Sequence, residues 1–150
     1  MCEMYDKAIK SAMNMLSRRE HSVLELTRKL QLREIPSSVI DEVIGSLIEN
    51  NLLSDERFAE SYVRMRSARG YGPQRVRLEL QERGIGSDLI GCYLDEAEID
   101  WYELANEVRS RKFAEDVPNE FELRAKQMRF LQYRGFSHAQ INAAMNGMDD

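Results

Sequence analysis

The sequence has little of what a metal centre or a disulfide framework needs, since its 150 residues include 2 cysteines and 2 histidines. Cys2 and Cys92 form at most one bridge, so we expect both thiols to be free in a reducing compartment. Cys92 lies in an apolar helical stretch, where we expect a small core residue. His21 and His138 have no Cys or His partner at ligand spacing, which predicts no metal, no cofactor and ordinary surface positions for both.

Long apolar runs are also missing. No stretch approaches the roughly 20 apolar residues that a membrane span needs, and the N-terminal residues lack the apolar core of a signal peptide. With 3 prolines and 8 glycines, collagen-like and linker-dominated architectures are excluded. A hydrophobic share of 43% with interspersed charges excludes a wholly disordered chain. We therefore expect a soluble, cytoplasmic protein.

Catalytic motifs are absent as well. The glycine-rich segment Gly70-Tyr71-Gly72-Pro73 is not a phosphate-binding loop of NTPases, because no Lys-Ser/Thr follows it and no strand precedes it. The sequence contains no Gly-x-Ser-x-Gly, Cys-x-x-Cys or His-Glu-x-x-His motif. Its many carboxylates fit helix caps and solvated helix faces, and no pair stands out as acid and base. We expect no enzymatic activity.

What the sequence does contain is helical periodicity along nearly its whole length. Apolar residues recur at i, i+3, i+4 and i+7 between Ile9 and Leu16, which predicts a helix over about residues 4–18. Ser22 and Glu25 form a capping box, the signature of a helix start. No credible alternation of period two and no Asn-Gly or Asp-Gly turn occurs. The fold class predicted is all-α.

The helical pattern repeats about every fifty residues. Leu30, Leu80 and Leu131 occupy equivalent positions, fifty and fifty-one residues apart, and the apolar residues after them also coincide. We therefore predict nine helices in three tandem three-helix repeats, stacked into an elongated, curved array. The predicted boundaries are 4–53, 54–99 and 100–148.

Two of the three units carry a glycine just after their second helix. Gly84 and Gly135 coincide in the alignment of the repeats, at a place where a left-handed helix end favours a residue without a Cβ. Glu34 occupies this position in the first unit. We therefore expect the first turn to be built differently.

Charge is distributed unevenly although the net charge is only −5. Residues 64–77 contain five arginines and no acid, residues 124–134 contain four cations and no acid, and six acids without a cation lie within 95–107. This segregation favours a surface that contacts phosphates or an acidic protein, with solvated helix faces as the alternative. The candidate contact residues are Arg64, Arg66, Arg69, Tyr71, Arg75 and Arg77 in the first basic stretch, and Arg124, Lys126, Arg129 and Arg134 in the second.

The turn inside the first basic stretch has a definite predicted geometry. Gly70 is suited to end one helix, Gly72 to cap the next and Pro73 to open it. This geometry places Tyr71 at the corner and brings the arginines of two helices together. We expect Arg75 and the first amides of the second helix to share an anion. The alternative is a plain interhelical turn whose arginines serve solubility.

These segments resemble the RecX family of regulatory proteins. The first repeat is similar from Leu16 to Leu30, including the Ser22 capping box. The combination of Asp55-x-Arg57-Phe58-Ala59 with Gly70-x-Gly72-Pro73 is specific for the family. The third repeat resembles the proteobacterial branch, from Ile99-Asp100-Trp101 through Arg111-Lys112-Phe113 to Arg129-Phe130-Leu131. The resemblance covers essentially the whole chain.

The resemblance implies a fold of three tandem three-helix repeats and a non-enzymatic modulator of the RecA recombinase. Members of the family bind the RecA filament on DNA along its helical groove and inhibit strand exchange, ATP hydrolysis and coprotease activity. This role would place the protein in the regulation of homologous recombination, DNA repair and the SOS response. We expect a monomer with weak, salt-dependent affinity for single- or double-stranded DNA. An interface with RecA would use Tyr71, Phe113 and Tyr133 as apolar anchors.

Two other classes of function stay open at this level. A stand-alone helix-turn-helix protein would place the fifth helix, which begins at Pro73, in a DNA groove, with Gln74 and Arg77 reading base edges on a dimeric frame. A helical-repeat adaptor would bind a protein without any effect of DNA, with Trp101 as a hot spot. Packing between repeats is the simpler role for this lone tryptophan.

Overall fold

The computed structural model describes residues 2–147, which form nine α-helices and no strand. None of these helices is both long enough and apolar enough to cross a membrane. The helices are α1 (Cys2–Arg18), α2 (Val23–Leu32), α3 (Ser37–Glu49), α4 (Asp55–Ala68), α5 (Pro73–Glu82), α6 (Ser87–Glu96), α7 (Trp101–Phe113), α8 (Phe121–Arg134) and α9 (His138–Asn146).

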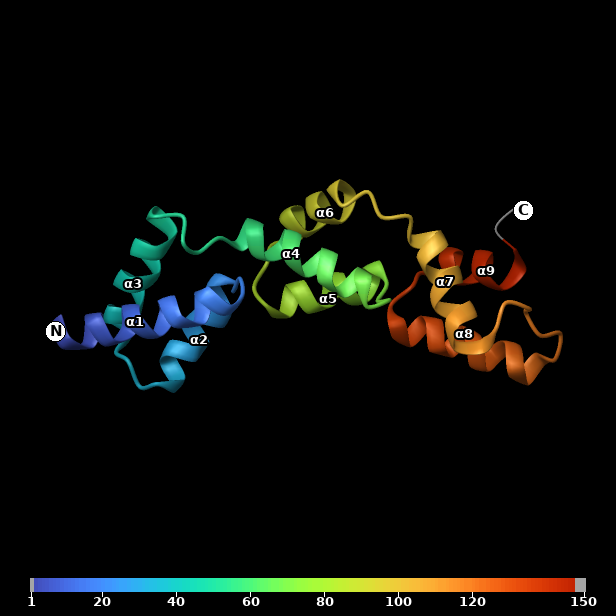
Figure 1. The fold of residues 1–150 in the computed structure, drawn as a ribbon, viewed down its shortest axis with the longest axis horizontal. Helices are drawn as coiled ribbons and strands as arrows, with labels where there is room; N and C mark the ends of the chain where they lie inside the picture. The colour runs from blue at the N-terminus through green and yellow to red at the C-terminus, as the bar shows by residue number, and fades with distance from the viewer. Residues whose placement is uncertain (1, 148–150) are drawn as a thin grey trace.

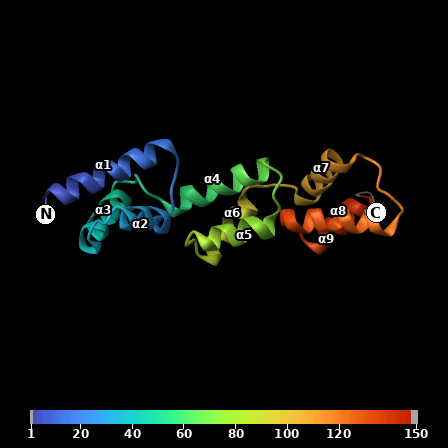
Figure 2. The same cartoon turned by 90° about the horizontal axis from the view of Figure 1, so that it is seen from below.

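The helices gather into three groups that lie in a row along the long axis of the molecule (Figures 1 and 2). Repeat 1 consists of α1–α3, repeat 2 of α4–α6 and repeat 3 of α7–α9, and the helix pairs with the most contacts lie within one repeat. Repeats 1 and 3 occupy opposite ends of the row. The prediction of an all-α chain built from three tandem three-helix repeats is confirmed for the described residues.

Each repeat has its own apolar core. The first core lies within residues 8–53, the second within 58–94 and the third within 105–145. Trp101 packs against both the second and the third core, which confirms the expectation that this side chain serves packing between repeats. The array therefore depends on contacts between small cores in addition to the cores themselves.

The predicted helix starts are present. The Ser22 hydroxyl accepts a hydrogen bond from the Glu25 amide at 3.1 Å, and the Glu25 carboxylate accepts one from the Ser22 amide, also at 3.1 Å. Ser54 caps α4 by accepting from the Arg57 amide at 3.2 Å. Gly72 caps α5, and Pro73 is its first residue. Sequence signals of this local kind are read correctly because capping involves only neighbours along the chain.

The turn after the second helix follows its prediction in repeats 2 and 3 but differs from it in repeat 1. Glu34 has a φ of 61°, the same left-handed region as Gly84 at 83° and Gly135 at 98°. In each repeat the amide of this residue donates to the carbonyl three residues earlier, and the next amide donates to the carbonyl five residues back. The expectation of a different first turn was therefore wrong, because Glu34 adopts the glycine conformation with its side chain in solvent.

Three polar or reactive residues also lie where the sequence did not place them. His21 is 2% exposed rather than on the surface, and Cys92 is exposed rather than in the core. Arg109 of α7 is 2% exposed, and its guanidinium donates to the carbonyls of Ala114 and Glu115 and to the Gln127 side chain. Arg109 thus holds the start of the α7–α8 connection against the third core, and no carboxylate of residues 2–147 pairs with it.

Candidate functional site

The glycine-rich turn between α4 and α5 is the contact between repeats 2 and 3. The Gly72 amide donates to the Arg134 carbonyl at 2.7 Å, and the Gln74 amide donates to the Gly135 carbonyl at 3.0 Å. Since Pro73 has no amide proton and the Gln74 amide is bonded to repeat 3, these positions offer an anion no donor. The expectation that an anion binds at the start of α5 is therefore wrong, because carbonyl groups of repeat 3 accept the hydrogen bonds that the anion would have accepted.

Close backbone approach explains the glycines at this contact. A Cβ on Gly72 would lie 2.5 Å from the carbonyl group of Gly135, and a Cβ on Gly135 would lie 2.2 Å from the Cβ of Arg75. Gly135 also has a left-handed φ, which penalises any side chain. The two turns therefore fit together only because both positions lack a side chain.

Tyr71 lies at the corner of the turn, as predicted, and three arginines surround its ring. The guanidinium carbon of Arg66 lies 3.8 Å from the ring centroid, that of Arg75 lies 4.5 Å away, and that of Arg134 lies 4.7 Å away. The sequence predicted the first two, which come from α4 and α5. Arg134 comes from repeat 3, so the cation–π cluster joins the repeats.

Glu79 neutralises much of this cluster. Its carboxylate accepts two hydrogen bonds of 2.9 Å from Arg66, one of 3.1 Å from Arg75 and one of 3.0 Å from the Tyr62 hydroxyl. Burial alone raises the pKa of Glu79, but these hydrogen bonds outweigh burial and hold the pKa below its ordinary value. The guanidinium groups of Arg66 and Arg75 are therefore paired with Glu79. They stabilise the turn, and their charge is less available to an external partner than that of an unpaired arginine.

Sequence reasoning missed Glu79 because it counted acids only up to Arg77. The available signal was the spacing of Arg75 and Glu79, which places the two side chains one helical turn apart on the same face.

The other candidate residues divide into engaged and free side chains. Arg64 pairs with Glu60 on the surface of α4, and Arg134 donates to the Arg69 carbonyl at 2.9 Å. Arg124 donates to the Pro118 carbonyl at 3.2 Å and to Asn146 at 2.9 Å. Four candidate cations have exposed side chains without an ion pair inside the described part of the chain; they are Arg69, Arg77, Lys126 and Arg129.

The structure adds two cations to the predicted set. Arg111 and Lys112, at the end of α7, line a hollow of about 400 Å³ together with Arg69 and Arg134. We call this space, where the end of α4 meets α7 and α8, the basic hollow. The two residues lie outside both acid-free stretches and follow Glu103 and Glu107, so charge counting along the chain did not reveal them.

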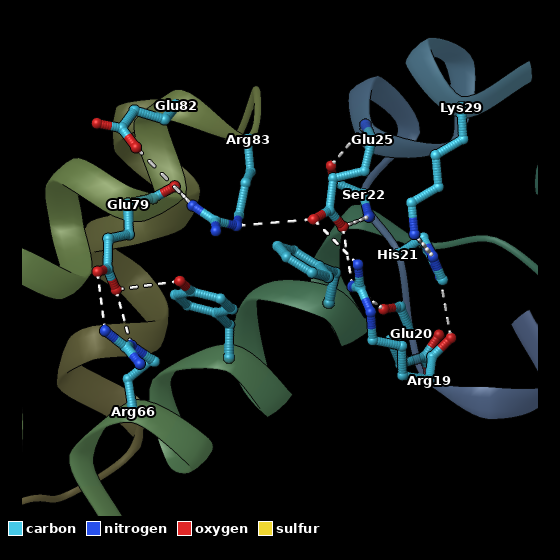
Figure 3. Close-up of polar contacts among 12 residues, drawn as sticks. Arg19, Glu20, His21, Ser22, Glu25, Lys29, Arg66, Glu79, Glu82 and Arg83 are labelled. Carbon is cyan, nitrogen blue, oxygen red and sulfur yellow. Dashed lines mark hydrogen bonds and ion pairs between the residues drawn. The ribbon is translucent and has the colours of Figure 1, made fainter. Parts of the chain in front are cut away.

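The contact between repeats 1 and 2 uses side chains. The Val23 amide donates to the Asp55 carboxylate at 2.8 Å, and Arg57 pairs with Glu20 at 2.8 Å. Arg83 lies 3.6 Å from Glu25 across the two repeats (Figure 3). Asp55 and Arg57 belong to the Asp-x-Arg-Phe-Ala motif. The two motifs that carry the family resemblance therefore both lie at contacts between repeats.

Gly84 serves this first contact in the way that Gly135 serves the second. A Cβ on Gly84 would lie 2.8 Å from the Cβ of Leu24, at the start of α2. In both contacts the left-handed glycine of one repeat meets the start of the second helix of the preceding repeat.

Residues 2–147 hold no group of three or more His, Cys, Asp or Glu side chains placed to bind a metal ion.

Comparison with protein-family models finds all three repeats in order. Residues 8–47 match the model described as RecX, first three-helix domain; residues 54–94 match the second three-helix domain and residues 98–145 the third. These three matches together cover most of the chain.

Individual relatives agree with these matches. The chain is 45% identical over 141 residues to the regulatory protein RecX of Ectopseudomonas mendocina (strain ymp), covering 94% of each chain. It is 46% identical to the regulatory protein RecX of Pseudomonas entomophila (strain L48), covering 93% of this chain and 90% of the relative. Its structure superimposes on the crystal structure of RecX from Lactobacillus salivarius with a TM-score of 0.81 and 25% identity, covering 99% of both chains.

Proposed function

The chain belongs to the RecX family of regulatory proteins, and on this premise we propose that it binds the RecA filament on DNA and inhibits RecA. The inhibited activities are ATP hydrolysis, strand exchange and coprotease activity. The observation that carries the proposal is the match of all three repeats, in order, to the three RecX domains. The protein acts by binding, as a monomer in the cytoplasm, without catalysing a reaction and without a cofactor.

The shape of the protein supports such a partner. Three small cores in a row give a long surface, and the contacts between repeats keep the row extended (Figure 1). An extended array can lie along a helical filament groove and contact more than one protomer. A compact domain of the same length would present a shorter surface.

The free cations are the proposed contact residues. Arg69, Arg77, Lys126 and Arg129 are exposed and have no carboxylate partner within residues 2–147, so their charge is available to DNA phosphates or to an acidic surface of RecA. Arg64 can join them, because its pair with Glu60 is 72% exposed on the arginine side and is correspondingly weak. Arg66, Tyr71 and Arg75 support the contact by holding the turn, and Arg124 and Arg134 by holding the ends of α8.

Docking of α5 on repeat 3 gives the helix-turn-helix hypothesis no support. A recognition helix enters a groove with its N-terminal end. In this structure that end of α5 is hydrogen-bonded to the turn before α9.

The test is RecA's ATP hydrolysis on single-stranded DNA with this protein titrated in. We expect the wild type to inhibit at less than one molecule per RecA. A variant with Arg69, Arg77, Lys126 and Arg129 changed to Ala should inhibit less, because it removes four uncommitted cations while leaving the pairs of Glu79 intact.

The matched control changes Lys7, Lys10, Arg18 and Arg28 to Ala, which removes the same charge from exposed positions of repeat 1. We expect this control to inhibit like the wild type. No inhibition by excess wild-type protein would overturn the RecA proposal. Equal weakening in both variants would overturn the assignment of the contact residues.

A further inference from the structure

The basic hollow combines cations from two repeats. Arg69 comes from the end of α4 in repeat 2, whereas Arg111, Lys112 and Arg134 come from α7 and α8 of repeat 3. Glu107 is the one acid among the residues that line it. The hollow exists because repeats 2 and 3 are docked, and the bond from Arg134 to the Arg69 carbonyl fixes that docking at its edge.

Other hollows of the array have a different charge balance. The one between α4 and α6 sets Arg64 against Glu60 and Glu96. The one between α5 and α8 sets Arg75 against Glu79 and Glu82. An excess of uncommitted positive charge therefore distinguishes the basic hollow from these two.

A fourth hollow, beside the end of α1, also contains three arginines, Arg18, Arg19 and Arg57. Two of them are already neutralised, since Arg19 pairs with Glu25 and Arg57 with Glu20. That hollow therefore offers an anion less free charge than the basic hollow does.

The cations of the basic hollow are not neutralised within residues 2–147. No ion pair within 4.0 Å involves Arg69, Arg111, Lys112 or Arg134 in this part of the chain. Even Glu107, one helical turn before Arg111, makes none. Like charges gathered without counter-charges repel one another, and a bound anion removes this repulsion.

An aromatic ring lies among these cations. Lys112 lies 5.6 Å and Arg134 lies 5.2 Å from the centroid of Phe130, which is half-buried and meets Phe113 edge to face. Helix geometry places Lys126 and Tyr133 on the same face of α8 as Phe130, because successive residues turn by 100°. Tyr133 is 71% exposed. Its ring lines the neighbouring hollow between α5 and α8, where the Arg75 guanidinium carbon lies 4.9 Å from the ring centroid. α8 therefore carries one aromatic ring in the basic hollow and a second ring beside it.

Proteins that bind single-stranded nucleic acids use this combination of cations and aromatic rings. Positive side chains follow the phosphates, while aromatic rings stack on bases that no complementary strand covers. The carboxylates of an acidic protein surface would pair with the cations, but they have no aromatic face to stack on the exposed ring of Tyr133. A duplex would leave both rings without an accessible base face.

We propose that the basic hollow binds the phosphodiester backbone of single-stranded DNA, with the aromatic face of α8 stacking on its bases. This inference deepens the proposed function and rests on it for the relevance of DNA. It concerns binding by the protein alone, so RecA inhibition and DNA binding fail independently. Arg111 and Lys112 are its decisive residues, since neither side chain forms an ion pair within residues 2–147.

The experiment is a titration of a fluorescein-labelled oligothymidylate with the full chain, without RecA, read by fluorescence anisotropy over a range of salt concentrations. Changing Arg111 and Lys112 to Ala should weaken binding about tenfold or more near physiological salt and reduce the slope of log K against log salt by about 1.4, or about 0.7 per phosphate contact. Changing Lys7 and Lys10 to Ala removes the same charge from repeat 1 and should leave the slope unchanged.

Two further variants separate contact from folding. Exchanging the two cations, Arg111→Lys with Lys112→Arg, should retain the slope, and Glu107→Gln should tighten binding. Equal losses in the variants of α7 and α1 would overturn the proposal, as would unchanged binding in the Ala variant. Competition by polyglutamate as effective as that by unlabelled oligothymidylate would overturn it in favour of an acidic protein.

Discussion

The backbone amide of Val23 donates a 2.8 Å hydrogen bond to the carboxylate of Asp55, thirty-two residues away in the next repeat. Both residues are the first of their helices, α2 and α4. The carboxylate thus lies near two helix N-termini, where the helix dipoles favour a negative charge. One side chain therefore caps α2 from outside and aligns repeat 1 with repeat 2.

Asp55→Ala should lower the free energy of unfolding by about 1–2 kcal/mol, because it removes a charge-assisted bond to a helix N-terminus. Thermal and urea unfolding measure the loss. Asp55→Asn keeps an acceptor oxygen and should lose less than half as much. Equal losses in the two variants would show that the bond to Val23 contributes nothing.

Gly135→Ala should destabilise the protein by at least about 2 kcal/mol, since a left-handed φ is costly for alanine and the new Cβ would collide with Arg75. The control is Gly45→Ala in α3, whose new Cβ meets nothing within 4 Å. We expect this change to stabilise the helix by about 0.5–1 kcal/mol. Chemical denaturation compares the two, and a Gly135→Ala protein as stable as the wild type would refute the close contact between the turns.

Glu79→Gln should cost about 1.5–3 kcal/mol, since the hydrogen bonds from Arg66, Arg75 and Tyr62 lose their charged acceptor. The wild-type contribution is present above the ordinary carboxyl pKa and is lost as the pH falls through the lowered pKa of the folded state. The difference in stability between wild type and variant should therefore shrink in acid. A difference that is constant from neutral pH to about pH 3 would contradict this account.

His21 should make stability depend on pH near neutrality. Burial and the positive charge of Arg19 lower its pKa, and Lys29, whose ammonium lies 2.9 Å from Nε2, acts in the same direction. A neutral ring accepts there and donates from Nδ1 to the Arg19 carbonyl. The folded state resists protonation, so this stability is full above about pH 6.5 and falls as the pH drops below it.

Unfolding of a His21→Gln variant, measured between about pH 7.5 and 5.5, provides the test, because it lacks the titrating ring. Its stability should change less over this range than that of the wild type, even though it is lower at neutral pH. Identical pH profiles for the two proteins would exclude His21 as the source.

The sequence predicts the parts of this fold that depend on near neighbours. Helical periodicity, the Ser22 capping box and the Gly70-to-Pro73 turn each involve residues within a few positions of one another, and all are present. The fifty-residue repeat also predicted three equivalent units, because apolar residues that recur at equivalent positions form equivalent cores.

Pairings over longer distances were out of reach. The contacts of Arg83 with Glu25 and of Arg134 with the Arg69 carbonyl join residues 58 and 65 positions apart, and no local pattern announces them. Charge counting treated every arginine of residues 64–77 alike, although Glu79 engages two of them and leaves Arg77 free. The candidate surface was therefore predicted in outline, but its free and bound cations became distinct only in three dimensions.

Glu34 distinguishes the first repeat from the other two at the position where a preceding repeat would dock. At Gly84 and Gly135 a bare backbone lets the preceding unit seat its helix start, whereas position 34 carries a side chain in the same left-handed conformation. A fourth unit engineered in front of the first would meet that side chain at the place where it has to dock. Adding a repeat in front of the first one by design would thus begin with Glu34→Gly, a substitution that removes the side chain from the face on which the added repeat would dock.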